Sequence, residues 1–342
     1  MAATNSAINL ISFRHAGPEP GHEVGRSRSD QDQIGPACQL RNALQTRPRG
    51  RSLLRSLMTD TAALASVTIV VVTYQSAHCL PRLGELLREA PYVVVVDNAS
   101  TDGTAAAVAQ HLPQAQLIRN IHNTGFGAAN NAGLAEVRTP YALLLNPDCE
   151  VTTDAISALH EAQQRFPEAG MLAPQIIDGN GLPEINYRWP STLGRSKGPG
   201  ATGPCCVGFL CGAIIWLNLS KTRPLGHFDT HFFLYYEDDD LTLRTFNQTI
   251  PMLVIPSIMA RHRSRGSVKG KAPLKAEYLR GFHHARSKIQ FTAKHVSPAA
   301  ARHLQLKTWS LALVSLGLRL LWPSPRHIAR NWGRVVALSR TV

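Results

Sequence analysis

The sequence predicts an α/β fold in which a mostly parallel mixed sheet is flanked by helices and followed by amphipathic C-terminal helices. Three observations predict it. Apolar runs rich in Val, Ile and Leu alternate with helical patterns over residues 67–166, an order typical of parallel strands joined by helices. The polar motifs of this half follow the ends of those runs. A segment rich in Lys and Arg, with Leu, Val and Trp between the charges, closes the chain.

Residues 1–57 differ in composition from the α/β part. They are rich in Arg, Ser, Gly, Pro and Gln and show no sustained periodicity, so we expect a disordered extension. The apolar stretch at 7–13 is too short for a signal segment with a cleavage site. Met58 stands just before the first expected strand, which leads to the hypothesis that translation starts there. We therefore divide the chain into this extension, an α/β domain at 58–295 and a basic helical segment at 296–342.

The expected elements of the α/β domain alternate between strand and helix. The apolar, β-branched run VTIVVVT at 67–73 indicates a strand that is covered on both faces. Further strands are expected at 92–96, 117–119, 141–145 and 252–255, and helices at 80–90, 104–111, 127–137 and 154–166. Because ligands bind at the carboxyl ends of the strands in parallel sheets, we expect the functional site in the loops that follow these strands.

A long segment rich in Gly and Pro interrupts this pattern at 178–208, around the sequence YRWP at 187–190. Loops of that length inside a domain are commonly functional or mobile. The chain becomes apolar again at 209–217, and the domain then continues to the strand expected at 252–255.

Charge is distributed unevenly along the chain. Residues 58–260 hold 11 Lys and Arg against 18 Asp and Glu, whereas residues 261–342 hold 17 against one. A basic end of this kind suggests an anionic partner, which could be a membrane surface, a nucleic acid or a phosphorylated substrate. A solvated basic surface is the alternative. Nucleic acid is disfavoured, because the basic end lacks interleaved aromatic residues or a known binding module.

Six cysteines stand at positions 38, 79, 149, 205, 206 and 211. No pair has the spacing of a zinc ribbon, and reduced thiols are the default for a chain with no recognisable secretory signal. We expect Cys149 to be a small buried residue.

Two motifs follow strands and open helices. In DNASTDGT at 97–104, the free N–H groups of a helix start favour an anion, although Ser100 and Asp102 could equally be plain caps. In NTGFGAANN at 123–131, two glycines let the backbone approach a ligand closely, and Asn130 and Asn131 oppose helix propensity, which indicates hydrogen-bonding roles. A tight turn before a helix is the alternative for the second motif.

Two further positions suit a metal ion. Asp148, in the sequence Asn146-Pro147-Asp148, follows an expected strand, and Mg²⁺ or Mn²⁺ prefers a few such oxygen ligands together with diphosphate oxygens. His262 could complete the site as a neutral imidazole, and the basic loop around it could hold diphosphate charge. Each of these positions is weak evidence alone.

Four consecutive carboxylates follow an aromatic run in FFLYYEDDDL at 232–241. Packed together they repel one another, which raises some of their pKa values, and a raised pKa suits a general base working near neutral pH. An acidic helix start stabilised by the helix dipole is the alternative. Both readings can hold together, with Asp239 and Asp240 at the helix start and with Glu237 and Asp238 facing the site.

Taken as an ordered set, these motifs resemble glycosyltransferase family 2, which has the GT-A fold, and within it the rhamnosyltransferase-like branch. The resemblance runs from about Val67 to His295. The matching pieces are VTYQ at 72–75, DNASTDGT at 97–104, NTGFGAANNAG at 123–133, LLLNPDCEV at 143–151, YRWP at 187–190, FFLYYEDDDLTLR at 232–244 and H-x3-G-S at 262–267.

The resemblance implies roles for individual residues. Asp238 would be the catalytic base with Glu237 beside it, and Asp148 and His262 would hold Mg²⁺ or Mn²⁺. Arg188 and Trp189 would shape the acceptor site. The nucleotide-sugar would be bound by Thr73, Tyr74, Asp97, Asn98, Ser100, Asp102, Gly125, Gly127, Asn130 and Asn146, of which Asn146 replaces the first acid of the family's metal-binding motif.

The implied activity is transfer of a sugar, with inversion, from a nucleotide diphosphate-sugar to a lipid-linked or polysaccharide acceptor in cell-envelope glycan synthesis. By resemblance the first choice of donor is dTDP-rhamnose. UDP-linked galactofuranose, glucose or N-acetylglucosamine is an alternative, and so is a nucleotide-sugar-binding protein without turnover. A processive synthase is disfavoured, because Arg188-Trp189 precedes the expected base and no Gln stands three residues before Arg188.

The basic C-terminal segment predicts attachment to a membrane surface without a span. Within 304–322, Lys307 and Arg319 leave 11 uncharged residues between them, against about 20 for a spanning helix. Apolar residues with basic flanks and tryptophans at 309, 322 and 332 indicate an interfacial helix instead. We expect a cytoplasmic protein that is peripheral on the inner face of the plasma membrane and contacts anionic lipid. An ordinary amphipathic helix packed on the α/β domain is the alternative.

Overall fold

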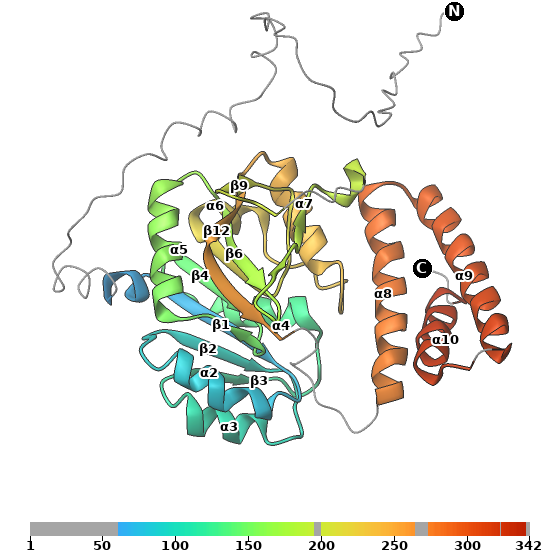
Figure 1. Cartoon of the computed structure of the whole chain (residues 1–342), viewed down its shortest axis with the longest axis horizontal. Coiled ribbons are helices and arrows are strands. Elements are labelled where there is room, and N and C mark those ends of the chain that lie inside the picture. Colours follow the sequence, from blue (N-terminus) through green and yellow to red (C-terminus); the bar gives the residue numbers. More distant parts are fainter. Residues whose placement is uncertain (1–60, 195–199, 264–272, 322, 340–342) are drawn as a thin grey trace, which may run out of the picture. The chain divides into compact units, whose positions relative to one another are not determined.

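The computed structural model describes residues 61–194, 200–263, 273–321 and 323–339, which all lie in one compact unit spanning residues 47–342 (Figure 1). The extension expected at 1–57 lies outside the described residues. So does the part of the basic loop after His262 that spans residues 264–272.

The centre of this unit is a mixed sheet with the strand order β3-β2-β1-β4-β11-β6-β12-β5. Its strands are β1 (Val67–Thr73), β2 (Val93–Asp97), β3 (Gln116–Arg119), β4 (Tyr141–Leu145), β5 (Cys149–Glu150), β6 (Met171–Ile177), β11 (Ile214–Asn218) and β12 (Met252–His262). The first four strands in this order pair in parallel, and β11 then runs antiparallel to both β4 and β6.

Short strands extend the sheet and form a small second one. Strand β7 (Pro183–Glu184) pairs with β6, and β9 (Cys205–Cys206) pairs with β12. Strands β8 (Tyr187–Arg188) and β10 (Phe209–Leu210) make a separate antiparallel pair. The long Gly- and Pro-rich segment of the sequence is therefore held to the rest of the protein at several points.

Helices cover both faces of the main sheet because alternate residues of each strand point to opposite faces. Ile69 and Val71 of β1 face the cluster formed with α2 (Leu80–Leu86), α3 (Thr104–His111) and α5 (Thr153–Arg165). Val70 faces the cluster formed with α4 (Phe126–Ala135) and α7 (Glu237–Asn247). All seven residues of β1 are buried, which agrees with the unbroken apolar run in the sequence.

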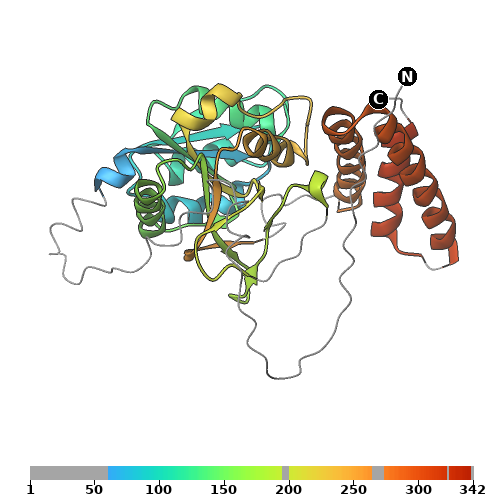
Figure 2. The ribbon, with the colours of Figure 1, turned by 90° about the horizontal axis from the view of Figure 1, so that it is seen from above.

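The three last helices are α8 (Pro273–His295), α9 (Pro298–Leu321) and α10 (Pro325–Ser339), which lie side by side (Figures 1 and 2). Two glycines let α8 and α10 pack closely. A Cβ atom added at Gly281 would lie 2.0 Å from the Arg330 carbonyl oxygen, and one at Gly333 would lie 2.1 Å from the Tyr278 carbonyl oxygen. Of the described helices, none is long and apolar enough to cross a membrane.

The expected α/β fold with C-terminal helices is confirmed, and three elements differ from the expectation. Strand β6 was not anticipated, because Pro174 and Gln175 interrupt its apolar pattern. Strand β12 continues beyond the expected end at 255 to His262, with a register shift between Ile255 and Met259. His262 therefore ends a strand and does not lie in a loop. The helix expected at 80–90 already ends at Leu86.

Candidate active site

The loops after β1 and β2 are bonded to each other at the carboxyl end of the sheet. The Asn98 N–H donates to the Thr73 carbonyl oxygen (2.8 Å), and the Gln75 N–H donates to Ser100 Oγ (2.9 Å). Gln75 and Ala99 have positive φ angles of 54° and 66°, which cost side-chain-bearing residues energy and are often found at functional sites. Thr73 is buried, whereas Tyr74 is 38% exposed.

Asp97 and Asp102 hold the loop at residues 97–104 through hydrogen bonds to backbone amides. Asp97 is 2% exposed, and its Oδ1 accepts from the Ser100 N–H (3.2 Å). Asp102 accepts from the Thr104 N–H (3.1 Å) at the start of α3 and from the Ala77 N–H (3.0 Å). Asp102 therefore bonds the first backbone amide of α3, whose N-cap residue is Gly103, and also holds the loop after β1.

Asn98 joins this region to the glycine-containing loop. Its Nδ2 donates to Asn123 Oδ1 (2.9 Å) and to the Gly125 carbonyl oxygen (3.2 Å). Its Oδ1 accepts from the Thr124 N–H (3.0 Å) and from Asn120 Nδ2 (3.0 Å). Asn98 is 3% exposed and holds the loop at residues 120–125 through these bonds. Its contact with the nucleotide stays a prediction.

The two glycines bring α4 against the acidic helix. A Cβ atom added at Gly125 would lie 2.4 Å from the Phe233 carbonyl oxygen, and that oxygen accepts from the Phe126 N–H (2.9 Å). A Cβ atom at Gly127 would lie 3.5 Å from Glu237 Cβ. The two glycines therefore let the backbone of α4 approach the segment that carries the acids, whereas the sequence predicted an approach to a ligand.

The two asparagines of this motif have the hydrogen-bonding roles that the sequence indicated. Asn130 is 2% exposed and donates to the Phe126 carbonyl oxygen within α4 (3.0 Å). Asn131 donates to the Phe228 carbonyl oxygen (2.8 Å) and accepts from the Phe228 N–H (2.9 Å). All three bonds are internal to the protein.

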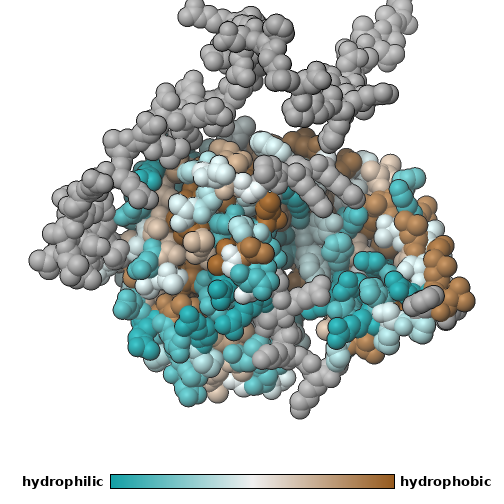
Figure 3. All heavy atoms as spheres, in the orientation of Figure 1, coloured by the Kyte–Doolittle hydropathy of each residue, from teal (hydrophilic) through white to brown (hydrophobic). Residues whose placement is uncertain are grey.

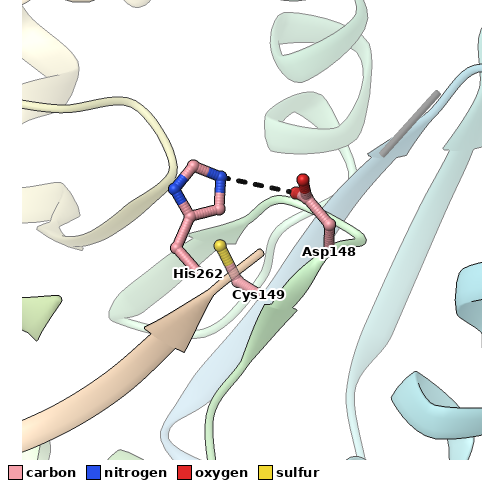
Figure 4. A group of neighbouring side chains, drawn as sticks. All are labelled: Asp148, Cys149 and His262. Atoms are coloured by element: carbon pink, nitrogen blue, oxygen red, sulfur yellow. Dashed lines mark ion pairs between the residues drawn. The ribbon is translucent and has the colours of Figure 1, made fainter. Parts of the chain in front are cut away.

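Asp148, Cys149 and His262 come together where β5 pairs with the end of β12 (Figure 4). His262 Nε2 lies 3.6 Å from Asp148 Oδ1, and the three ligand atoms lie within 4.8 Å of one another. Asp148 and Cys149 are 5% and 2% exposed. Two ligands of one octahedral Mg²⁺ lie about 3 Å apart when adjacent and about 4 Å apart when opposite, so Asp148 and His262 fit one ion.

Cys149 is a poor third ligand in this group. Burial, followed by the charge of Asp148, raises the pKa of its thiol well above the ordinary value, and only the thiolate binds metal well. A soft sulfur also suits Mg²⁺ and Mn²⁺ less than oxygen does. The group therefore offers one carboxylate and one imidazole, as expected, and Cys149 is a small buried residue at its edge.

Asp238 lies in the first turn of α7 and is held by two backbone amides. The Gly212 N–H donates to its Oδ2 (3.0 Å), and the Asp239 N–H donates to its Oδ1 (3.0 Å). Burial, followed by the charge of Asp239, raises the pKa of Asp238 to about 6. An acid with this pKa is ionised at neutral pH and still basic enough to accept a proton.

Glu237 lies beside Asp238 and is more deeply buried, at 5% exposure. Burial, followed by the charge of Asp238, raises the pKa of its carboxyl well above the ordinary value. Among the described residues its Oε2 has no hydrogen-bond partner. A neutral Glu237 beside an ionised Asp238 avoids the repulsion of two buried charges.

The acidic helix begins after two residues in a left-handed backbone conformation. Tyr235 and Tyr236 have φ angles of 67° and 68°, each of which costs about 1–3 kcal/mol for a non-glycine residue. Ring contacts from α8 hold them, with His284 5.6 Å and 5.5 Å from their centroids and Phe291 5.3 Å from that of Tyr236. Backbone strain therefore lies directly before the expected base.

The structure places the two expected acceptor residues differently. Arg188 Nη2 lies 2.6 Å from Asp239 Oδ1, and its guanidinium stands 3.8 Å from the centre of the Phe209 ring. Arg188 is thus at the start of α7, next to the base. Trp189 is 51% exposed and contacts Phe246, near the other end of α7 (5.9 Å between ring centres).

One short segment, which sequence reasoning missed, contacts both Asp238 and two neighbours of Asp148. Ala213 O accepts from the Asn146 N–H (2.9 Å) and from the Cys149 thiol (3.6 Å), while the adjacent Gly212 N–H binds Asp238. A Cβ atom at Gly212 would lie 3.4 Å from Asp238 Cβ. The signal available in the sequence was a glycine next to a cysteine within an apolar run.

Asp240 is a second residue whose role was missed. It is fully buried and contacts two cationic side chains and one imidazole, at distances of 2.9 Å to Arg244 Nε, 2.6 Å to Lys294 Nζ and 2.7 Å to His295 Nε2. Lys294 and His295 come from the end of α8, which is therefore bonded to α7. Four adjacent acids gave no sign of which one would face these side chains.

A cavity of about 730 Å³ lies elsewhere, at the amino end of β4. Thr139, Tyr141, Asn218 and Arg223 are among the residues that line it, and none of the expected site residues is. In sheets of this type, chemistry is expected at the carboxyl ends of the strands, where the residues described above converge.

Comparison with known proteins agrees with this geometry. Residues 68–215 match the model of the family described as Glycosyl transferase family 2. The N-acetylglucosaminyl-diphospho-decaprenol L-rhamnosyltransferase of Mycobacterium tuberculosis, in two strains, is 29% identical over 262 residues, which cover 66% of this chain and 84% of that protein. The low-salt glycan biosynthesis hexosyltransferase Agl10 of Haloferax volcanii is 26% identical over 198 residues, which cover 55% and 64%.

Solved structures are similar at a greater distance. The mannosyltransferase PcManGT from Pyrobaculum calidifontis, in complex with GDP-Man and Mn2+, has a TM-score of 0.49 and 16% identity, covering 80% of this chain and 86% of that one. The S. aureus TarS 1-349 structure has a TM-score of 0.47 and 14% identity, covering 79% and 90%. The family match itself ends before Asp238 and His262.

Proposed function

The chain carries a glycosyltransferase family 2 domain of the GT-A fold, and we propose that it transfers a sugar from a nucleotide diphosphate-sugar to an acceptor hydroxyl with inversion at the anomeric carbon. The observation that carries the proposal is the link through Gly212 and Ala213. This segment binds Asp238, whose pKa is raised to about 6, and also binds Asn146 and Cys149, which lie on either side of Asp148 in the chain. Asp148 and His262 form a carboxylate–imidazole pair suited to a divalent ion. Inverting transfer needs both functions close together.

In this proposal Asp238 accepts the proton of the acceptor hydroxyl as its oxygen attacks the anomeric carbon. The amides of Gly212 and Asp239 keep both carboxylate oxygens in place, and a preorganised base needs no rearrangement during the reaction. Burial and the charge of Asp238 favour the neutral form of Glu237, which would keep the site from carrying two adjacent negative charges. A bound Mg²⁺ or Mn²⁺ would neutralise charge on the departing diphosphate, and Asp148 and His262 are its proposed protein ligands.

The donor would lie along the loops after β1 and β2 and at the start of α4. Tyr74 is 38% exposed, and Asn98, Ser100 and Asp102 hold the loops together through hydrogen bonds. We propose dTDP-rhamnose as the donor, because the rhamnosyltransferase of Mycobacterium tuberculosis matches 66% of the chain. UDP-linked galactofuranose, glucose or N-acetylglucosamine is the alternative.

We propose a lipid-linked sugar diphosphate as the acceptor, in keeping with the name of the same relative, and place the reaction in the cytoplasm at the inner face of the plasma membrane. Arg188 is a candidate acceptor contact because it lies at the start of α7, beside the base. Trp189, exposed near the end of the same helix, would act at a more distant part of the acceptor.

The test is a panel of nucleotide diphosphate-sugars, each incubated with the protein, Mn²⁺ and a polyprenyl diphosphate-sugar, with release of the nucleotide diphosphate as the readout. We expect turnover with one donor, loss of turnover on chelation, and loss in the Asp238→Asn variant. The matched control is Asp154→Asn, at an exposed acid in the first turn of α5. Donor binding with no turnover under any of these conditions would instead favour the nucleotide-sugar-binding protein.

A further inference from the structure

Helix α9 turns a row of large apolar side chains outward. The exposed fractions lie between 39% and 80% for Leu306, Leu311, Leu313, Val314, Leu318 and Leu321, which we call the α9 face. Positions 311, 314, 318 and 321 are three or four residues apart, so they lie along one side of the helix. Soluble proteins rarely leave a contiguous apolar stripe of this kind uncovered.

The opposite side of α9 makes the contacts with the protein. Ala301 and Ala312 are 3% and 4% exposed, and Leu304 and Trp309 pack against a small cluster with Ile289 of α8. An ordinary amphipathic helix buries its large apolar residues and exposes polar ones. Helix α9 packs through two alanines together with Leu304 and Trp309 but leaves most of its leucines exposed, which disfavours the view that it merely covers the α/β domain.

The surroundings of the α9 face are basic. No Asp or Glu follows Glu277 in the sequence, and the exposed residues on α9 and α10 include Arg302, Lys307 and Arg326. Trp332 of α10 is 53% exposed, and tryptophan favours the boundary between lipid and water. In the space-filling view, hydrophobic spheres gather over the region where α9 is drawn (Figures 1 and 3).

We propose that the α9 face inserts into the headgroup region of an anionic lipid bilayer. Apolar side chains leave water there, and the basic residues beside them meet lipid phosphates. A second copy of the chain is a less suitable occupant, because pairing two such faces would bring like charges together. Nucleic acid would leave the leucines exposed. The inference deepens the proposed function by naming the surface that meets the membrane of a lipid-linked acceptor.

Contacts of α8 connect this face with the acidic helix. Ser287 Oγ donates to the Leu234 carbonyl oxygen (2.9 Å), just before the two strained tyrosines, and Lys294 binds Asp240 in α7. Helix α9 packs on α8 in turn. A bilayer at the α9 face would therefore hold the base-bearing helix at a set position relative to the lipid surface.

The experiment is flotation of the full chain with vesicles of phosphatidylglycerol and phosphatidylcholine, compared with vesicles of phosphatidylcholine alone. The apolar variant is Leu311→Gln with Val314→Gln and Leu318→Gln, and its control is Leu182→Gln at another exposed leucine (63%). The charge variant is Arg302→Glu with Lys307→Glu, and its control is Arg88→Glu, also exposed. Circular dichroism checks the fold of each variant.

We expect the wild type to float with anionic vesicles at low salt. The apolar variant and the charge variant should each have a vesicle partition coefficient about tenfold or more below that of the wild type. Both controls should float like the wild type. The inference is overturned if the wild type does not bind at low salt, or if the apolar variant binds as well as Leu182→Gln. It is also overturned if light scattering finds a dimer that only the apolar variant dissociates, without vesicle binding. Turnover with a water-soluble acceptor, measured in parallel, reports on the proposed function separately.

Discussion

Asp238 lies in the first turn of α7, with one carboxylate oxygen on the Gly212 amide and the other on the Asp239 amide. Replacing it with Asn keeps the shape and removes the proton acceptor. We therefore expect Asp238→Asn to lower kcat on the order of a hundredfold or more while donor affinity stays nearly unchanged. Steady-state kinetics and donor titration check this, and turnover within a few-fold of the wild type would remove Asp238 from the role of base.

The raised pKa of Asp238 also predicts how activity depends on pH. Because only the ionised carboxylate accepts a proton, activity should rise with pH through about 6 and reach a plateau above it. The measurement is kcat/KM between pH 4.5 and 8 at saturating Mn²⁺. An enzyme whose activity is flat across this range, or falls as pH rises, would contradict the assignment.

Asp148 and His262 should affect metal-dependent donor binding. We expect Asp148→Ala to abolish the increase in thermal stability that donor plus Mn²⁺ produces, and His262→Ala to weaken it, because each variant removes one of two proposed protein ligands. The control is Asp154→Ala, an exposed acid in α5. Donor affinity in Asp148→Ala that equals the wild-type value, with and without chelator, counts against the site.

Individual residues show where prediction from the sequence ends. Asp148 and His262 could be paired in advance only through the family resemblance, and the structure brings them within 3.6 Å. The bonds of Asn98 to residues near position 123 could not be anticipated, because its partners lie more than 20 positions away. For the same reason, no local pattern revealed that Asp240 meets Lys294 and His295.

Among the elements, α7 and α8 are joined through Asp240, which forms ion pairs with Arg244 and Lys294 and contacts His295. Asp240→Asn leaves the two cations without their shared carboxylate. Because breaking a buried ion pair leaves uncompensated charge, we expect the free energy of unfolding to fall by about 3 kcal/mol or more. Denaturant titration beside Asp154→Asn checks this, and an equal stability of the two variants would show that the cluster does not hold the helices together.

Strands and helices were predictable to different degrees. The strands of the parallel half follow unbroken apolar runs, and the sequence located β1, β2 and β4 to within a residue. Strand β6 was not predicted, because Pro174 and Gln175 interrupt its run of apolar residues. Strand β12 was cut short in the prediction because the chain shifts register after Ile255 before pairing again through His262.

For the whole molecule, the raised pKa values of Glu237 and Asp238 predict how stability depends on pH. A carboxyl whose pKa is higher in the folded than in the unfolded state favours folding at low pH, and this contribution is lost as pH rises through the folded pKa. Between pH 4 and 7 we therefore expect Asp238→Asn to gain stability relative to the wild type, by about 1–2 kcal/mol at pH 7.

Unfolding free energies of the wild type and of Asp238→Asn, compared at several pH values, isolate this effect. Other carboxyls, such as Asp229, have pKa values lowered in the folded protein, and they change stability equally in both. A difference between the two proteins that does not grow from pH 4 to 7 would contradict the raised pKa of Asp238.

The segment from Cys211 to Ala213 limits which substitutions the protein can accept during evolution. Gly212 binds Asp238, the proposed base, while Ala213 binds the neighbours of Asp148, a proposed metal ligand. Burial raises the pKa of the Cys211 thiol to about 12, so this thiol stays protonated at neutral pH. If these roles hold, a substitution that shifts this segment would alter proton removal and donor activation at once. Directed evolution of donor preference should therefore meet strong epistasis here, with beneficial changes arriving in pairs and seldom singly.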